Sequence, residues 1–266
     1  MTFTGVIGAA CMFPLRVIIG ACVALRIHPN VLTLVGVIIN FAAAWQFAQG
    51  DFLAAGFIMT GGNIFDFIDG KVAEATDTKS EFGGFWDSVM DRFSDLSLFV
   101  GVIYLYSELD STFYVMVAAL ALIFSVMTSY ARARAESIIE RCKVGFMERP
   151  ERIVLVMIGA FTNRMAGILW VILVLSVVTV LDRIYFTWRA LKSQEASPAW
   201  LGKSLFTLPL RAIWHALYWT FDRATWQYDL MVIAILSFVW LTPPALIGDP
   251  TATGPGLIGI VLEQIR

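Results

Sequence analysis

The chain has 266 residues, and 58% of them are hydrophobic. A water-soluble domain of this length has no use for so much apolar surface, so the composition excludes an ordinary soluble protein and indicates a lipid environment. The formal net charge of -2 is uninformative by itself, because in a membrane protein the positions of the charges matter more than their sum.

The N-terminal segment is apolar from its first residues, with no basic stretch in front of the apolar run. It is therefore not typical of a secretory signal peptide. We expect residues 5–27 to form a helix at the membrane surface, with Arg16 and Arg26 reaching out to water.

Six apolar runs follow, near residues 31–49, 52–76, 82–107, 112–139, 150–163 and 165–190. Because lipid offers no partners for open backbone groups, we expect every run to be helical. Asn30, which follows Pro29, is the predicted N-cap of the first helix. The predicted fold is all-α: a polytopic transmembrane bundle with six core helices.

The segment after the sixth run has a mixed composition. Tryptophans and leucines alternate with basic residues over 199–227, which is typical of an interfacial helix. Residues 228–247 could form a seventh span, a re-entrant segment or a surface segment. We therefore divide the chain into an N-terminal interfacial helix (1–27), a six-helix core (28–192) and a C-terminal extension (193–266).

Basic residues are concentrated on one side of the predicted core. By the positive-inside rule that side is cytoplasmic, and both ends of the core lie there. The residues on this side are Lys79, Arg132, Arg134, Arg141, Lys143, Arg149, Arg152, Arg183, Arg189 and Lys192, whereas the other side shows Arg164.

Four aspartates interrupt otherwise apolar helices, and a carboxylate near lipid is costly enough to indicate function. Asp66 and Asp69 are spaced i,i+3, and Asp87 and Asp91 are spaced i,i+4, so each pair shares a helix face. The two helices are joined by the short polar loop 77–81 and must run antiparallel. We expect all four carboxylates to converge at one depth, near the cytoplasmic surface.

Converged anions repel one another unless a cation neutralises them. Lys71 and Arg92 are the nearest basic residues, and we expect them to point to other faces. Hard divalent ions with oxygen ligands, Mg²⁺ or Mn²⁺, meet the requirement, and shared carboxylates commonly bridge two ions in phosphoryl chemistry. The sequence therefore predicts a pair of metal ions held by the four aspartates.

Glycines accompany these acids. Glycine inside a helix is unfavourable, so it usually marks the close approach of another backbone or of a ligand. We expect Gly70 and Gly83 to face a ligand, whereas Gly61, Gly62 and Gly84 suit helix packing.

The stretch from Asp66 to Asp91 reads DFIDGKVAEATDTKSEFGGFWDSVMD. It resembles the signature of the CDP-alcohol phosphotransferases (CDP-alcohol phosphatidyltransferases), D-x-x-D-G-x-x-A-R, a spacer, then G-x-x-x-D-x-x-x-D. The positions that match are Asp66, Asp69, Gly70, Ala73, Gly83, Asp87 and Asp91. The resemblance covers residues 28–190 and implies the family's six-helix membrane fold and its release of CMP from a CDP-activated donor.

The resemblance also implies a role for each acid. Asp66, Asp69 and Asp87 would hold one metal ion. Asp66, Asp87 and Asp91 would hold the second, and Asp91 would be the general base for the acceptor hydroxyl. The implied donor is CDP-diacylglycerol, and a homodimer is compatible with the family. The implied nucleotide-donor site consists of Asn30, Val31, Leu32, Thr33, Gly70, Ala73, Glu74, Ser80 and Gly83.

One position departs from the signature, because the family's arginine is Glu74 here. A glutamate cannot hold the diphosphate as that arginine does. Lys71 could pair with Glu74 or take over the phosphate contact.

A basic stretch after the fourth run interleaves arginines with glutamates. Its A-R-A-E and G-F-M-E-R-P-E-R segments resemble the branch of the family that makes phosphatidylinositol phosphate. Arginines held by carboxylates can form a fork for phosphate, and purely structural salt bridges are the alternative. The candidate acceptor-phosphate ligands are Arg132, Arg134, Arg149 and Arg152.

These features predict a metal-dependent transferase of phospholipid biosynthesis, integral to the membrane, with its active site facing the cytoplasm. It would move a phosphatidyl group from CDP-diacylglycerol to a phosphorylated polyol, with inositol 1-phosphate favoured and glycerol 3-phosphate or another alcohol as alternatives. A cation transporter also uses intramembrane acids, but it would spread them along a path. A non-catalytic scaffold is favoured only by Glu74. Membrane lipid is an expected partner, and nucleic acid is not.

Overall fold

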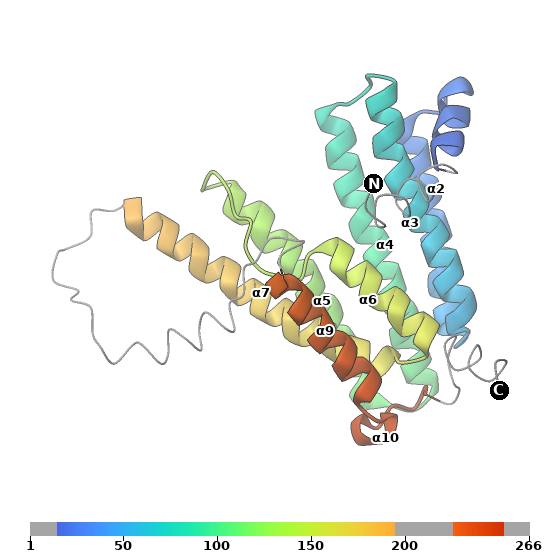
Figure 1. Cartoon of the computed structure of the whole chain (residues 1–266), viewed down its shortest axis with the longest axis vertical. Helices are drawn as coiled ribbons and strands as arrows, with labels where there is room; N and C mark the ends of the chain where they lie inside the picture. Colours follow the sequence, from blue (N-terminus) through green and yellow to red (C-terminus); the bar gives the residue numbers. More distant parts are fainter. Residues whose placement is uncertain (1–14, 195–225, 253–266) are drawn as a thin grey trace. The chain divides into compact units, whose positions relative to one another are not determined.

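The computed structural model of the chain describes residues 15–194 and 226–252 (Figure 1). Every regular element in this described part is a helix, which confirms the predicted all-α class. The chain forms two compact units, Met1–Leu105 and Tyr106–Arg266. The candidate metal ligands belong to the first unit, and the candidate acceptor arginines belong to the second.

The helices coincide with the predicted apolar runs. The first unit holds a helix at Leu15–Ala24, α2 (Pro29–Ala48), α3 (Phe52–Ala75) and most of α4 (Glu81–Glu108). The second unit holds α5 (Thr112–Glu136), α6 (Arg149–Thr162), α7 (Met165–Gln194), α9 (Trp226–Leu241) and α10 (Pro244–Ile247).

Four described helices are long and apolar enough to cross a membrane: α2, α3, α5 and the Met165–Lys192 part of α7. α4 has the length, but acidic and basic side chains interrupt its first half. α6 has only 14 residues, about 21 Å of helix, against a hydrocarbon core of about 30 Å. The number of crossings in the core therefore stays a prediction.

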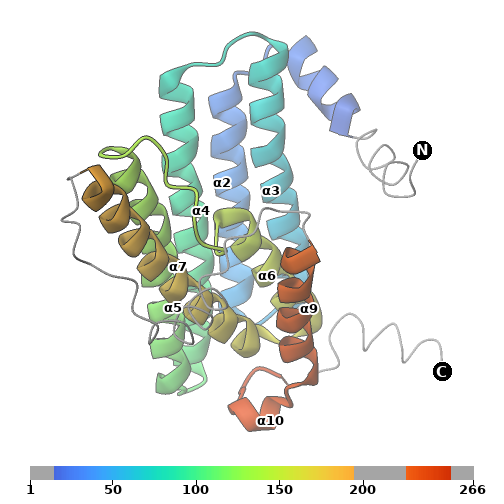
Figure 2. The ribbon, with the colours of Figure 1, turned by 60° about the vertical axis from the view of Figure 1, so that its left-hand side comes forward.

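The first unit is built from tight connections. α2, α3 and α4 lie side by side in both views (Figures 1 and 2). Between α2 and α3, Gly50 has a φ of +78°, which a residue with a side chain rarely adopts. Asp51 then accepts a hydrogen bond from the Ala54 N–H at 3.0 Å and begins α3. The connection between α2 and α3 is therefore short and well defined.

Small residues let α2 approach its neighbours closely. A Cβ on Gly62 would lie 3.0 Å from the Asn40 side chain, and one on Gly101 would clash with the Ala44 carbonyl oxygen. The packing role predicted for Gly62 therefore agrees with the structure. A Cβ on Gly61 would meet no atom of the described chain within 4 Å, so the packing prediction for Gly61 is not supported.

The start of the first core helix differs from the prediction. His28 is the N-cap, and its Nδ1 accepts a hydrogen bond from the Asn30 N–H at 3.2 Å. Pro29 takes the first helical position, where the missing N–H has no helical partner to lose. Asn30 is therefore not the cap. The preceding helix stops at Ala24, so Arg26, with a φ of +52°, lies beyond the end of this helix, although the prediction included it.

The described residues 226–252 of the C-terminal extension contact other helices of the second unit. α9 has 16 residues, about 24 Å, which is short of a full span, and it ends before the prolines. Arg164 donates to the Thr242 carbonyl at 3.1 Å, and the Tyr114 hydroxyl donates to the Ile247 carbonyl. The interfacial helix predicted over 199–227 lies almost entirely outside the described residues, and the division at 27 and 192 stays a prediction.

Candidate metal and nucleotide site

Three aspartates of α3 and α4 form the centre of the candidate site. One carboxylate oxygen from each of Asp66, Asp69 and Asp87 lies within 4.8 Å of the other two. Asp69 is 6% exposed, and Asp66 and Asp87 are half-buried. Carboxylate oxygens are the ligands that a hard divalent cation prefers, and three of them at this spacing can bind one such ion. These residues therefore fit the predicted metal.

Asp91 lies one turn further along α4 and outside this group of three. A helical turn advances about 5.4 Å, which separates Asp91 from Asp87 along the axis. Its carboxylate is buried, and Oδ2 lies 3.6 Å from the Arg92 Nη1. Asp91 is thus not one of the three residues whose oxygens lie within 4.8 Å of one another, and one expectation is corrected: Arg92 does not point away from the acids.

Thr33 of α2 holds the most buried of the three carboxylates. Its hydroxyl donates to the Asp69 Oδ2 at 2.5 Å. The Thr33 hydroxyl oxygen also lies 3.2 Å from the Pro29 carbonyl oxygen. Thr33 itself is 4% exposed. The start of α2 therefore orients a candidate metal ligand on α3, which is a role that the sequence did not indicate.

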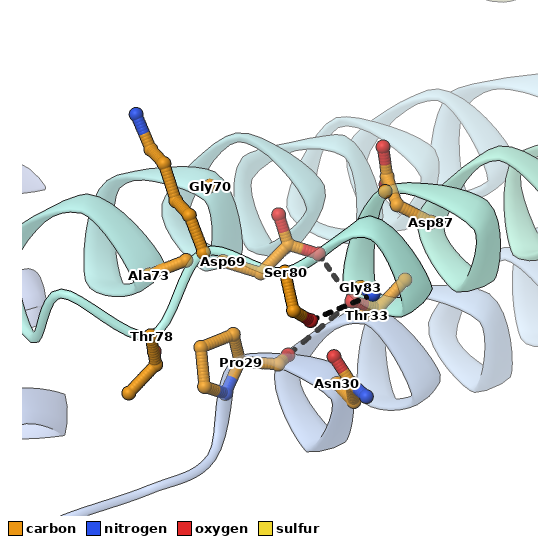
Figure 3. A pocket seen from close by; sticks show the side chains of 12 residues that line it. Pro29, Asn30, Thr33, Asp69, Gly70, Ala73, Thr78, Ser80, Gly83 and Asp87 are labelled. Atoms are coloured by element: carbon orange, nitrogen blue, oxygen red, sulfur yellow. Dashed lines mark hydrogen bonds between the residues drawn. The ribbon is translucent and has the colours of Figure 1, made fainter.

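A cavity of about 280 Å³ opens beside this carboxylate cluster (Figure 3). Its walls come from the start of α2, the end of α3 and the start of α4. The lining residues that the sequence named are Asn30, Thr33, Asp69, Gly70, Ala73, Ser80, Gly83 and Asp87. The lining residues that it did not name as ligands are Pro29, Thr78, Lys79 and Gly84.

Three residues named for the nucleotide site do not line this cavity. Leu32 is 4% exposed and packs in an apolar cluster with Cys22, Ile68 and Val72. Val31 is half exposed on the outer face of α2. Glu74 is exposed at the end of α3 and bonds to lysines. Successive residues of an α-helix lie about 100° apart around its axis, so four consecutive positions cannot all point at one ligand.

The glycines keep the cavity open. A Cβ on Gly70 or Gly84 would meet no atom of the described chain within 4 Å, so the packing prediction for Gly84 is not supported. Ser80 Oγ accepts a hydrogen bond from the Gly83 N–H at 3.0 Å (Figure 3). That bond begins α4, which explains the presence of Ser80 in the link.

Glu74 has two lysine partners. Its Oε2 lies 3.0 Å from the Lys71 Nζ, as one of the two hypotheses for Lys71 predicted. Its Oε1 lies 3.4 Å from the Lys79 Nζ, a contact that the sequence did not indicate. The acid at the family's arginine position is thus paired with positive charge on both oxygens.

A separate cluster of arginines lies within the second unit. Arg132 donates to the carboxylates of Glu136 and Glu148, each at 3.1 Å. Arg183 of α7 is 2% exposed, and its Nη2 lies 3.7 Å from the same Glu148 oxygen. The two guanidinium groups therefore meet at one carboxylate.

Arg152 joins this cluster through α5. It is 4% exposed and donates to the Thr128 hydroxyl at 3.0 Å, while Arg183 donates to the carbonyl of the same threonine. Arg134, in contrast, is exposed and donates to Ser137 at 3.1 Å, so it does not belong to the cluster. The sequence prediction uses Arg183 only to assign the cytoplasmic side of the core. Its place inside an apolar run is a signal that could have identified it as a functional residue.

The Thr33 contact predicts an effect on metal affinity. Thr33→Val removes the hydroxyl that orients Asp69, and loss of such a supporting bond weakens metal binding by about tenfold or more. We expect the dissociation constant for Mn²⁺, followed by electron paramagnetic resonance, to rise accordingly. Thr33→Ser keeps the hydroxyl and should bind Mn²⁺ like the unaltered chain. Equal affinity in Thr33→Val would contradict the orienting role.

Comparison with known proteins places the chain in a family. The family model of the CDP-alcohol phosphatidyltransferases matches residues 26–182, so the chain belongs to this family. It is 36% identical over 173 residues to the archaetidylinositol phosphate synthase of Pyrococcus horikoshii, covering 65% of this chain and 89% of the relative. It is 35% identical over 145 residues to the phosphatidylinositol phosphate synthase of Cutibacterium acnes, covering 51% and 67%.

Solved structures agree with this assignment. The phosphatidylinositol phosphate synthase of Mycobacterium tuberculosis with CDP-DAG bound matches with a TM-score of 0.62 at 26% identity, over 71% of this chain and 98% of that one. The same enzyme in complex with manganese and citrate matches with a TM-score of 0.62 at 26% identity, over 71% and 93%. The chain is therefore an integral membrane transferase, and its aspartate cluster indicates use of a divalent metal.

Proposed function

We propose that this enzyme transfers the phosphatidyl group of CDP-diacylglycerol onto the hydroxyl of a phosphorylated polyol, inositol 1-phosphate, and releases CMP. The observation that carries the proposal is the group of three carboxylates within 4.8 Å of one another, beside a cavity that the signature residues line. The names of the relatives from Pyrococcus horikoshii and Cutibacterium acnes support an inositol phosphate product.

In the proposed site the aspartates would share two Mg²⁺ or Mn²⁺ ions. Asp66, Asp69 and Asp87 would hold the first, and Asp66, Asp87 and Asp91 would hold the second. Bound ions of this kind neutralise a diphosphate and stabilise the charge that develops during transfer. The position of Asp91 one turn from Asp87 supports a ligand set that extends along α4 rather than one compact group.

The chain's own residues then account for the transfer. The Asp91 carboxylate takes the proton from the acceptor hydroxyl, whose oxygen bonds to the phosphorus that carries the lipid. The bond from that phosphorus to the CMP phosphate oxygen breaks, and CMP leaves. Gly70, Ala73 and Gly83 offer no bulky side chain, so the nucleotide can lie against α3 and α4.

The basic residues support a cytoplasmic active site. Arg132, Arg141 and Lys143 lie at the end of α5 and in the link to α6, which the positive-inside rule assigns to the cytoplasm. CMP and inositol phosphate are polar and water-soluble, so a site open to the cytoplasm also suits both.

The acceptor phosphate is proposed to bind the arginine cluster. Arg132, Arg149 and Arg152 come from the sequence prediction, and Arg183 is added because it shares Glu148 with Arg132 and Thr128 with Arg152. Planar guanidinium groups held by carboxylates are preorganised for a phosphate, whereas a neutral alcohol gains nothing from them. Glycerol 3-phosphate carries the same charge and is the rival acceptor.

An acceptor screen tests the proposal. The full chain, purified in nanodiscs with Mg²⁺ and radiolabelled CDP-diacylglycerol, receives inositol 1-phosphate, inositol or glycerol 3-phosphate at equal concentrations. We expect CMP release and a labelled phosphatidylinositol phosphate with the first acceptor. A preference for unphosphorylated inositol would overturn the acceptor assignment, and the absence of CMP release with every acceptor would overturn the reaction.

The arginines give a prediction of their own. Arg149→Ala and Arg152→Ala should each raise the KM for the phosphorylated acceptor by about tenfold or more, because a charge-assisted hydrogen bond contributes about 1.5–3 kcal/mol. The KM for the donor should change far less. Arg141→Ala, an exposed arginine of the same basic stretch, is the matched control. Equal changes in both KM values would indicate structural salt bridges instead.

A further inference from the structure

Lys79 is the cationic side chain among the described residues that line the nucleotide cavity. It lies in the link between α3 and α4, together with Thr78 and Ser80, which line the same cavity. Its side chain is 65% exposed, so its ammonium group is open to a soluble anion. At the position where the signature has an arginine, which would supply positive charge here, this chain has Glu74, and Glu74 does not line the cavity.

The link that carries Lys79 is attached to the end of α3. The Thr78 N–H donates to the Ala73 carbonyl at 3.0 Å, and the Thr76 and Thr78 hydroxyls lie 2.8 Å apart. Asp77 adopts a φ of +52°, which turns the chain back toward the cavity. The backbone of the link is therefore held in place, and only the long Lys79 side chain needs to be oriented.

Glu74 provides this orientation. Its two oxygens are divided between two lysines, with Oε2 at 3.0 Å from Lys71 and Oε1 at 3.4 Å from Lys79. An ammonium group has three donors, so Lys79 can keep Glu74 and still donate to a phosphate oxygen. Exposed ion pairs are weak, so Glu74 does not withhold Lys79 from a stronger anion.

We propose that Lys79 contacts the phosphates of the nucleotide donor and that Glu74 is a positioning residue that holds Lys79 at the cavity. The positive charge that the family carries on the helix is, in this chain, carried by the adjoining link. This inference rests on the proposed function, because it assumes a CDP-linked donor in the cavity.

CDP binding tests the role of Lys79 without any turnover. The full chain in nanodiscs with Mn²⁺ is titrated with CDP by calorimetry. Lys79→Gln should weaken binding by about tenfold, the range of one charge-assisted contact. Lys71→Gln loses the same charge and the same Glu74 partner but is not part of the cavity wall, so its effect should be under about twofold. Equal losses from the two lysines would overturn the contact.

The positioning role of Glu74 is tested by measuring how Glu74→Gln changes CDP affinity, once with Lys79 present and once in the Lys79→Gln variant. If it positions Lys79, Glu74→Gln should weaken CDP binding about twofold to threefold when Lys79 is present. With Gln at position 79 the same change should no longer weaken binding, because the residue it orients is gone. Tighter binding by Glu74→Gln with Lys79 in place would show that Glu74 only repels the phosphates, and the positioning role would be wrong.

The failure of this inference is distinct from failure of the proposed function. An unaltered chain that neither binds CDP nor releases CMP contradicts both. An unaltered chain that binds CDP, alongside a Lys79→Gln variant that binds it equally well, contradicts only the role of Lys79. In turnover assays, Lys79→Gln should raise the KM for the donor while the KM for the acceptor stays unchanged.

Discussion

Asp87→Ala is expected to lower turnover by on the order of a thousandfold or more, and added Mg²⁺ should not restore it. Asp87 is one of the three carboxylates within 4.8 Å of one another, and in the proposed site it contacts both metal ions. Its loss therefore weakens both sites together. Asp66→Ala should behave in the same way, whereas restored turnover at high Mg²⁺ would argue against a bridging carboxylate.

Metal-dependent stability separates this loss from misfolding. Mn²⁺ should raise the melting temperature of the unaltered chain, because a ligand stabilises the state that binds it. Asp87→Ala should lose most of that increase. Without metal the variant should be at least as stable as the unaltered chain, because one of three mutually repelling carboxylates is gone. Glu81→Gln, an exposed acid in the first turn of α4, is the matched control and should keep both turnover and the Mn²⁺ effect.

Asp91→Asn is expected to lower turnover by about a hundredfold to ten-thousandfold, the usual contribution of a general base. An amide keeps an oxygen at the same place but cannot accept the acceptor's proton. CDP binding, measured by calorimetry with Mn²⁺, should change by less than about threefold. A comparable loss of CDP binding would show that Asp91 serves as a metal ligand first and would remove the basis for the base assignment.

The Arg92 contact requires its own control. Arg92 Nη1 lies 3.6 Å from the Asp91 carboxylate, so Asp91→Asn also removes an ion pair. Arg92→Gln removes the pair and leaves the carboxylate. If it retains most of the turnover, the loss in Asp91→Asn belongs to proton transfer. If both variants lose turnover equally, the pair itself accounts for the effect.

The centre of the site could be predicted because it depends on short-range geometry. The i,i+3 spacing of Asp66 and Asp69 placed them on one face of a helix, and the short polar loop required α4 to return beside α3. These two features were sufficient to predict that Asp87 lies beside Asp66 and Asp69. The contact between Asp91 and Arg92 could not be predicted in this way, because it depends on the rotamers of the two side chains.

The supporting contacts depend on tertiary structure and were missed. The Thr33 bond to Asp69 joins residues 36 positions apart, and the Arg183 bond to Thr128 joins residues 55 apart. A sequence pattern shows neither. The contact from Lys79 to Glu74 depends on the positive φ of Asp77, which nothing in the composition of the link required. Helix existence was predictable from apolar runs, whereas the His28 cap was not, because an imidazole nitrogen is an uncommon cap.

The short link between α3 and α4 has a consequence for the order of assembly. Contacts between neighbouring segments close with a smaller loss of chain entropy than contacts between distant ones. All four aspartates lie on this one hairpin, and their Thr33 support comes from the helix just before it. The arginine cluster instead requires α7, which is synthesised much later. A nascent chain can therefore complete the acidic hairpin on the ribosome before the arginine cluster exists, and a nascent chain stalled before α7 should already capture Mn²⁺.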